Sequence, residues 1–141
     1  MTTMKNRLFA VLLIASAIFT APAIARDPVA IINYENLVVA TNSGNVLQAE
    51  QVKQAIVTAA GAKNWSIAYQ SDGTLLATLN VRNKHTIMTG IAYAADKYSL
   101  RYTGSTNMKF GERDGQPVIH PYYNKWVQEF KEAIRIELLK L

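Results

Sequence analysis

The residues best suited to chemistry in this chain are its two histidines, His85 and His120. The chain has no cysteine, so a metal site would need both imidazoles together with carboxylates. The two rings could meet if the last helix begins over the end of the sheet where His85 opens a strand. The favoured interpretation is simpler: each histidine makes a structural hydrogen bond, capping a helix or closing a turn. We therefore predict no metal site and no cofactor.

A nucleophile and a base can also be drawn from the sequence, with Ser99 or Ser105 beside His120. No carboxylate stands at a spacing that would orient the histidine, and Glu112 and Asp114 are most simply solvated. The chain has no phosphate-binding loop, no H-E-x-x-H and no G-x-S-x-G. We predict no catalytic residue. A hydrolase or metal-binding protein centred on His85 or His120 is the weaker alternative.

Aromatic and amide side chains gather around one loop and the start of the last helix, as a glycan or peptide site requires. This group comprises Tyr98, Tyr102, Ser105, Asn107, His120, Tyr122, Tyr123, Asn124 and Trp126. A structural role fits equally well, because Tyr98, Tyr102, Tyr123 and Trp126 have core spacing. Both interpretations stay open.

Cationic side chains form a second group that could line the wet face of the sheet and meet an anionic partner. These are Arg82, Lys84, Arg101 and Lys109. Solubility is the alternative explanation. Together, the two groups give the candidate ligand-binding residues Arg82, His85, Arg101, Ser105, Asn107, His120, Tyr122 and Asn124.

Alternating apolar and polar residues predict the strands that must position these side chains. Segments 65–70, 75–82, 87–93 and 98–102 alternate with a period of two and are separated by short breaks. Short breaks favour antiparallel neighbours. Residues 37–40 form a further short apolar run that predicts a short strand. Residues 29–32 could be an edge strand or a strap, and 104–118 is predicted to be a polar loop.

Two helices complete the pattern. Over Gln48–Ala60, Val52, Ala55, Ile56 and Ala59 recur at spacings of three and four, with Gly61 as the expected C-terminal cap. The last helix begins at Pro121, and its apolar series is Tyr123, Val127, Phe130, Ile134, Leu138 and Leu141. We therefore expect an α+β two-layer sandwich: a four-stranded antiparallel meander, two helices packed on one face, and possibly an extra N-terminal strand.

The N-terminus has the features of a secretory signal peptide. Lys5 and Arg7 precede the apolar stretch Leu8–Phe19, and Ala23-Ile24-Ala25 is a small-x-small cleavage site. The stretch is shorter than the roughly twenty residues of a spanning helix. We predict a signal peptide over 1–25, a single domain over 26–141, and a periplasmic or secreted product with no transmembrane segment. Met4 is an alternative start.

Charge argues against a nucleic-acid partner. Loss of Lys5 and Arg7 lowers the formal net charge from +5 to +3, and the remaining basic residues are spread along the chain. Nucleic-acid binding requires a dense basic face. The expected partner is an unknown small ligand or an envelope protein.

The chain also resembles a family of small exported proteobacterial proteins that are described as lipoproteins or hypothetical periplasmic proteins. The resemblance lies in His85 to Tyr102, in Ser105-Thr106-Asn107-Met108, in the segment from Ile119 to Trp126, and in the helix start Ala49-Glu50-Gln51-Val52. It implies an exported product of this domain extent and no established activity. The anchoring cysteine of lipoproteins is absent, so tethering to a membrane is not implied.

These observations favour a periplasmic, non-enzymatic binding or interaction module that uses the polar cationic sheet face and the 104–118 loop. An envelope-assembly protein that docks through an exposed strand edge is the alternative.

Overall fold

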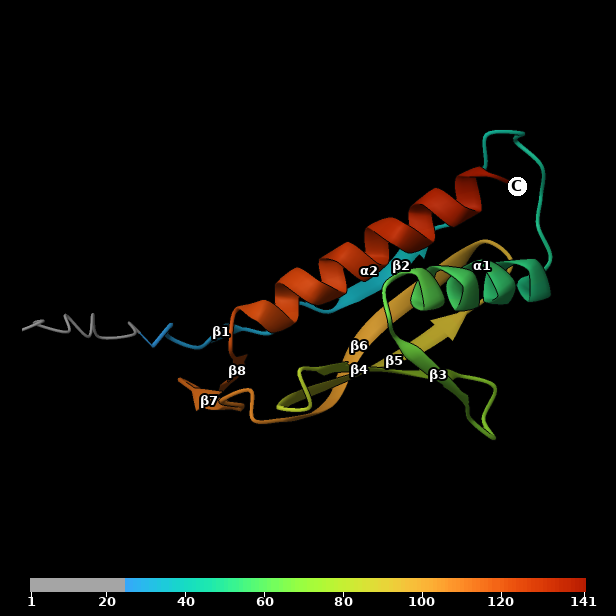
Figure 1. Ribbon diagram of the computed structural model, residues 1–141. Helices are drawn as coiled ribbons and strands as arrows, with labels where there is room; N and C mark the ends of the chain where they lie inside the picture. The colour runs from blue at the N-terminus through green and yellow to red at the C-terminus, as the bar shows by residue number, and fades with distance from the viewer. Residues whose placement is uncertain (1–24) are drawn as a thin grey trace, which may run out of the picture.

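The computed structural model describes residues 25–141, and this part of the chain is α+β, with two helices and two antiparallel sheets (Figure 1). All but the last residue of the predicted signal peptide lies outside the described residues. The elements follow in the order β1 (Val29–Ala30), β2 (Tyr34–Val38), α1 (Ala49–Ala62), β3 (Ser66–Tyr69), β4 (Leu75–Val81), β5 (His85–Tyr93), β6 (Lys97–Thr106), β7 (Gly111–Arg113), β8 (Gln116–Ile119) and α2 (Tyr122–Leu139).

The larger sheet has five strands in the order β2-β6-β5-β4-β3, with every neighbouring pair antiparallel. The four alternating segments of the sequence are therefore strands. Strand β2 pairs with the outer edge of β6 as the fifth strand, so the possible extra N-terminal strand exists and overlaps the short apolar run over 37–40. The hairpin between β3 and β4 closes through Gly73 at φ +85°, and the Asp72 carboxylate accepts a hydrogen bond from the Thr74 backbone N–H at 2.9 Å.

A bulge in β6 changes which residues face the core. Met88 of β5 pairs with Gly104, whereas Thr89 pairs with Tyr102, so Thr103 is the extra residue. A Cβ on Gly90 would lie 2.9 Å from Thr103 Cγ2, which explains the glycine as a close approach of the neighbouring strand. Beyond the bulge, Ser105 turns to the same side as Tyr102.

The second sheet has three strands in the order β1-β8-β7 and replaces the predicted polar loop over 104–118. Strand β6 runs to Thr106, and β7 and β8 form a hairpin. Asp114 and Gly115, at φ +52° and +74°, supply the left-handed turn that such a hairpin needs. The loop prediction was wrong because strands of three and four residues are too short to show alternation.

Helix α1 buries the predicted face, with Val52, Ile56 and Ala59 fully enclosed. Its N-terminus is closed by the Gln51 side chain, whose Oε1 accepts from the Gln48 backbone N–H at 2.9 Å. The predicted glycine cap was wrong: Gly61 lies inside the helix, and Asn64 takes the left-handed conformation at φ +62°.

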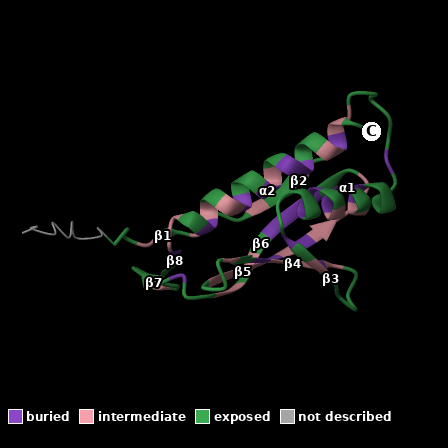
Figure 2. Ribbon diagram, in the orientation of Figure 1, coloured by how far each residue is buried: buried purple, intermediate pink, exposed green. Residues whose placement is uncertain are grey.

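Helix α2 carries the centre of the core. Tyr123, Val127, Phe130, Ile134 and Leu138 are all buried, as their spacing predicts, whereas Leu141 is exposed. Phe130 stacks on Trp65 at 4.8 Å between ring centroids. Figures 1 and 2 show α1 and α2 next to each other beside the five-stranded sheet, and buried residues of both helices and of the sheet belong to one core cluster. Over residues 25–141, neither helix is long and apolar enough to cross a bilayer.

Candidate functional site

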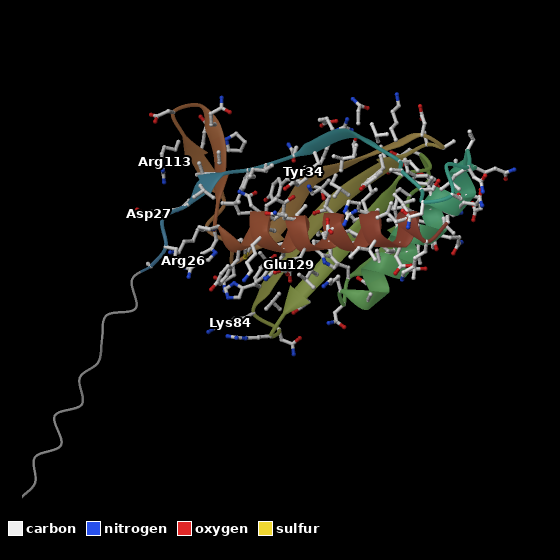
Figure 3. All side chains as sticks on the ribbon, turned by 90° about the horizontal axis from the view of Figure 1, so that it is seen from above. Arg26, Asp27, Tyr34, Lys84, Arg113 and Glu129 are labelled. Atoms are coloured by element: carbon white, nitrogen blue, oxygen red, sulfur yellow. The ribbon has the colours of Figure 1, made fainter. Side chains whose placement is uncertain are left out.

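A small hollow lies where α2 begins, and five side chains line it. We call it the histidine pocket. It has a volume of about 100 Å³, and its lining residues are His85, Met108, His120, Tyr122 and Trp126. Three of the predicted ligand-binding residues therefore come together from different parts of the sequence. Figure 3 shows Arg26 and Lys84 at this same end of α2.

His120 is held at the entrance of the helix by its own ring. Its Nδ1 accepts a hydrogen bond from the Tyr122 backbone N–H at 3.2 Å, and its carbonyl oxygen accepts from the Tyr123 N–H at 3.0 Å. These bonds satisfy two of the N–H groups that a helix start leaves unpaired, a task for which histidine is unusual. The predicted capping role is confirmed.

Burial lowers the pKa of His120 below its ordinary value of 6.5, and the positive charges of Lys109, Arg26 and His85 lower it further. The ring is therefore neutral at pH 7. A neutral imidazole whose Nδ1 accepts a hydrogen bond carries its proton on Nε2. His120 thus has an N–H group left to donate to a ligand.

His85 is held in the opposite tautomer, with its proton on Nδ1. Its Nδ1 lies 2.7 Å from the carbonyl oxygen of Asn107 and must donate to it, which leaves Nε2 as the acceptor when the ring is neutral. The Asn107 side chain donates in turn to the Lys84 carbonyl oxygen at 3.0 Å. Asn107 has φ +57°, a conformation that asparagine tolerates better than most residues. Its role is to hold His85 in place.

The opposite tautomers weigh against the metal alternative. A metal on Nε2 needs a lone pair there, and in His120 that nitrogen carries the proton as long as Nδ1 caps the helix. Among the residues that the structure describes, no three His, Asp or Glu side chains gather as a metal site would require.

Aromatic rings and cations complete the site. The ring of Tyr122 lies 4.9 Å from that of His120 and 5.4 Å from that of Trp126, measured between centroids. The Arg26 guanidinium lies 5.0 Å from the centre of the Tyr122 ring, and Lys125 Nζ lies 5.8 Å from it. Among the described residues, those that line the pocket include no acid, and the cations Arg26 and Lys125 lie beside its aromatic wall.

Lys109 reaches the same place from the link between β6 and β7. Its Nζ donates to the Arg26 carbonyl oxygen at 3.4 Å, and its charge acts on His120. Lys109 has φ +52°, so a left-handed turn sets its position. The sequence pattern predicted Lys109 on the face of the sheet. It did not predict Arg26 or Met108 as site residues, because no local pattern relates them to the histidines.

Two of the predicted site residues have their polar groups engaged elsewhere. The Asn124 side chain donates to the Ala30 carbonyl oxygen at 2.9 Å and accepts from the Ile32 N–H at 3.0 Å, so it ties β1 to α2. Ser105 Oγ lies 2.9 Å from the Tyr102 hydroxyl. Both contacts are structural, and neither side chain lines the histidine pocket.

The sheet face is not the cationic surface that the sequence suggested. Arg82 and Lys84 lie at the turn between β4 and β5, and Lys109 lies outside the five-stranded sheet. Arg101 does face outward, but its Nε donates to Glu35 Oε1 at 2.6 Å, and this bond holds the pKa of Glu35 below its ordinary value. Its neighbours across the outer face are uncharged; the pairings place Ala68, Leu76, Thr78, Met88 and Gly90 there.

Two larger hollows adjoin this region. One, of about 560 Å³, lies between the helices, and none of the predicted site residues lines it. The other, of about 320 Å³, contains Arg82 and shares Trp126 with the histidine pocket. Comparison of the chain with protein-family models, with curated proteins and with solved structures finds no match.

Proposed function

We propose that the protein is a non-enzymatic binding module of an exported compartment, and that the histidine pocket takes the anionic end group of its ligand. One observation carries the proposal: a pocket with an uncharged aromatic wall is surrounded by Arg26, Lys109 and Lys125 and has no acid in its lining. Cations around a partly desolvated hollow attract a carboxylate or phosphate more strongly than they would in open water.

The hydrogen-bonding groups suit the same ligand. The neutral His120 ring retains an N–H donor at Nε2, and the cations supply further donors. The apolar side of the end group would rest on Met108 and Trp126. The proposal includes export of the protein, cleavage after Ala25, and membership of the exported family that the chain resembles. Cleavage at that point would make Arg26 the first residue and add an α-amino group beside Tyr122 and Lys109.

We further infer that the helices form one layer and the five-stranded sheet the other. In this arrangement α2 lies across the strands, and the pocket opens at the helix end instead of on the sheet face. The predicted use of the sheet face as the binding surface is replaced by this site.

Tryptophan fluorescence tests the proposal. The chain has two tryptophans, so Trp65→Phe leaves Trp126 as the sole reporter. Titration with benzoate at low salt should give a saturable change with Kd on the order of 1 mM, as expected for a fragment-sized ligand. Calorimetry on the unaltered chain gives the same constant if the core substitution is harmless.

Benzyl alcohol is the matched probe, because it has the same ring without the charge. Lys109→Gln should weaken benzoate binding several-fold, and Arg101→Gln, which removes a distant cation, should leave it unchanged. Equal affinity for benzyl alcohol, or indifference to Lys109→Gln, would contradict the proposal.

Envelope assembly is the second candidate, and strand β3 favours it. Among residues 25–141, β3 ends the sheet and no strand pairs with its outer edge, and its residues Ser66, Ala68 and Tyr69 are exposed. A partner strand could add to such an edge. If this is the function, a protein recovered from envelope extracts will be lost with Ala68→Lys and kept with His120→Asn. Retention by both variants would exclude the β3 edge.

A further inference from the structure

We infer that the ligand is an acidic oligosaccharide: the carboxylate of its terminal sugar enters the histidine pocket, and its next sugar units lie in the neighbouring hollow across Trp126. This inference rests on the function proposed above and extends it to the class of ligand.

The volume of the histidine pocket limits how much of a ligand it can enclose. The histidine pocket has about 100 Å³, whereas sites that enclose a whole small molecule usually have about 300 Å³ or more. It can therefore hold only one end of a ligand. The rest must continue along the surface, and the direction in which it leaves is set by the walls.

Trp126 gives that direction. Its side chain lines both the histidine pocket and the hollow of about 320 Å³ on the other side. The indole is partly exposed, and Tyr122 packs near it at 5.4 Å. A ligand that passes from one hollow to the other must cross this ring. The C–H face of a sugar is a good match for an indole, because both are apolar surfaces with polar rims.

The lining of the second hollow fits a hydroxyl-rich chain. Its polar side chains are Lys63, Asn64, Asn80, Arg82 and Glu129. The two carboxamides both donate and accept hydrogen bonds, as sugar hydroxyls do, and the carboxylate of Glu129 accepts them. Lys63 and Arg82 can meet further acidic groups along the chain. The apolar part of the lining consists of Leu79 and Val81 beside the tryptophans. Charged side chains surround it, so the hollow is a poor site for an acyl chain.

Asn64 and Arg82 of this lining hold left-handed conformations at φ +62° and +55°, one after α1 and the other at the β4–β5 turn. Arg82 was a predicted ligand-binding residue, and the hollow gives it a place beside Trp126.

The test is calorimetric, on the unaltered chain, with a hexuronic acid monomer and its tetramer. The tetramer should bind at least tenfold tighter than the monomer, which exceeds the roughly fourfold advantage of having four equivalent units. Arg82→Gln and Asn80→Ala should remove most of this gain and leave monomer binding unchanged. Arg101→Gln removes the same charge on the far face and should leave the gain intact.

The outcomes separate the two claims. If monomer and tetramer bind equally well, the oligosaccharide inference fails, whereas the pocket for an anionic group stands. If tetra-alanine, which has a free terminal carboxylate, binds as tightly as the tetramer, the ligand is a peptide end and the saccharide assignment is overturned. If neither hexuronate nor benzoate binds, the proposed function itself fails.

Discussion

His120 serves two purposes with one ring. Nδ1 closes the first turn of α2, and Nε2 keeps its hydrogen in a ring that lines the histidine pocket. Protonation would place a hydrogen on Nδ1 as well and turn the acceptor into a donor, so the bond from the Tyr122 N–H would be lost. The chemistry of the pocket and the start of the helix therefore depend on the same proton.

Stability should fall in mild acid because of this ring. The pKa of His120 is lower in the folded chain than the ordinary 6.5, owing to burial and then to Lys109, Arg26 and His85. As the pH falls below about 6.5, the unfolded chain takes up the proton more readily, which favours unfolding. His120→Asn keeps a capping acceptor and removes the titration.

Urea unfolding at pH 7.5 and pH 5.5 measures this effect. The loss of unfolding free energy between the two values should be smaller in His120→Asn than in the unaltered chain. The other titratable groups are common to both proteins. A loss of equal size in both would show that His120 does not titrate as described.

Thr89 and Tyr123 form a polar contact inside the core. The Tyr123 hydroxyl lies 3.4 Å from Oγ1 of Thr89, both residues are fully buried, and burial raises the pKa of Tyr123 to about 12. Thr89→Val keeps the shape but leaves the tyrosine hydroxyl without this partner, and should cost about 1–3 kcal/mol. The double variant Thr89→Val with Tyr123→Phe should recover part of the loss. Strictly additive losses in denaturant unfolding would mean that the two hydroxyls do not interact.

At the scale of elements, Asn124 joins the small sheet to α2. Its carboxamide makes one bond as donor and one as acceptor to the backbone on either side of Ile31. Asn124→Ala should therefore cost about 1–3 kcal/mol and release β1. Hydrogen exchange at the Ile32 amide should speed up, whereas exchange in β5 should keep its rate. An unchanged Ile32 amide would show that β8 alone holds β1.

The long elements could be predicted because their patterns repeat. Val52 to Ala59 and Tyr123 to Leu138 recur with the helical period, and β4 alternates from Leu75 to Val81, so burial followed the sequence. The bulge at Thr103 could not be placed from the sequence, since its one sign, Gly90 in the facing strand, is compatible with either a bulge or a close backbone approach. It reversed the side on which Ser105 lies. The Asp114-Gly115 turn was readable, but its strands are too short to alternate.

The candidate site was predictable in part. His85, His120 and Tyr122 do meet, because the last helix begins at the end of the sheet where β5 starts. Arg101 and Asn124 do not join them, since each finds a polar partner of its own. Arg26 and Met108 could not be predicted as site residues from the sequence. Only the fold brings the segment before β1 and the link between β6 and β7 to the start of α2.

On the scale of the whole molecule, the distribution of charge favours the end where α2 begins as the binding site. The outer face of the five-stranded sheet bears Arg101, which Glu35 already pairs, beside uncharged side chains such as Leu76 and Met88. Arg26, Lys109 and Lys125 lie near the start of α2 instead, and Figure 3 shows Arg26 and Lys84 at that end. An anionic ligand would be steered to that end.

The most direct measurement is a long-range ¹H–¹⁵N spectrum of the histidine rings at pH 7.5, recorded without and with benzoate. We expect His85 with its proton on Nδ1 and His120 with its proton on Nε2, and both rings should shift on titration while the backbone amides of Leu76 and Met88 stay in place. Two rings in the same tautomer, or shifts confined to the outer sheet face, would contradict the account.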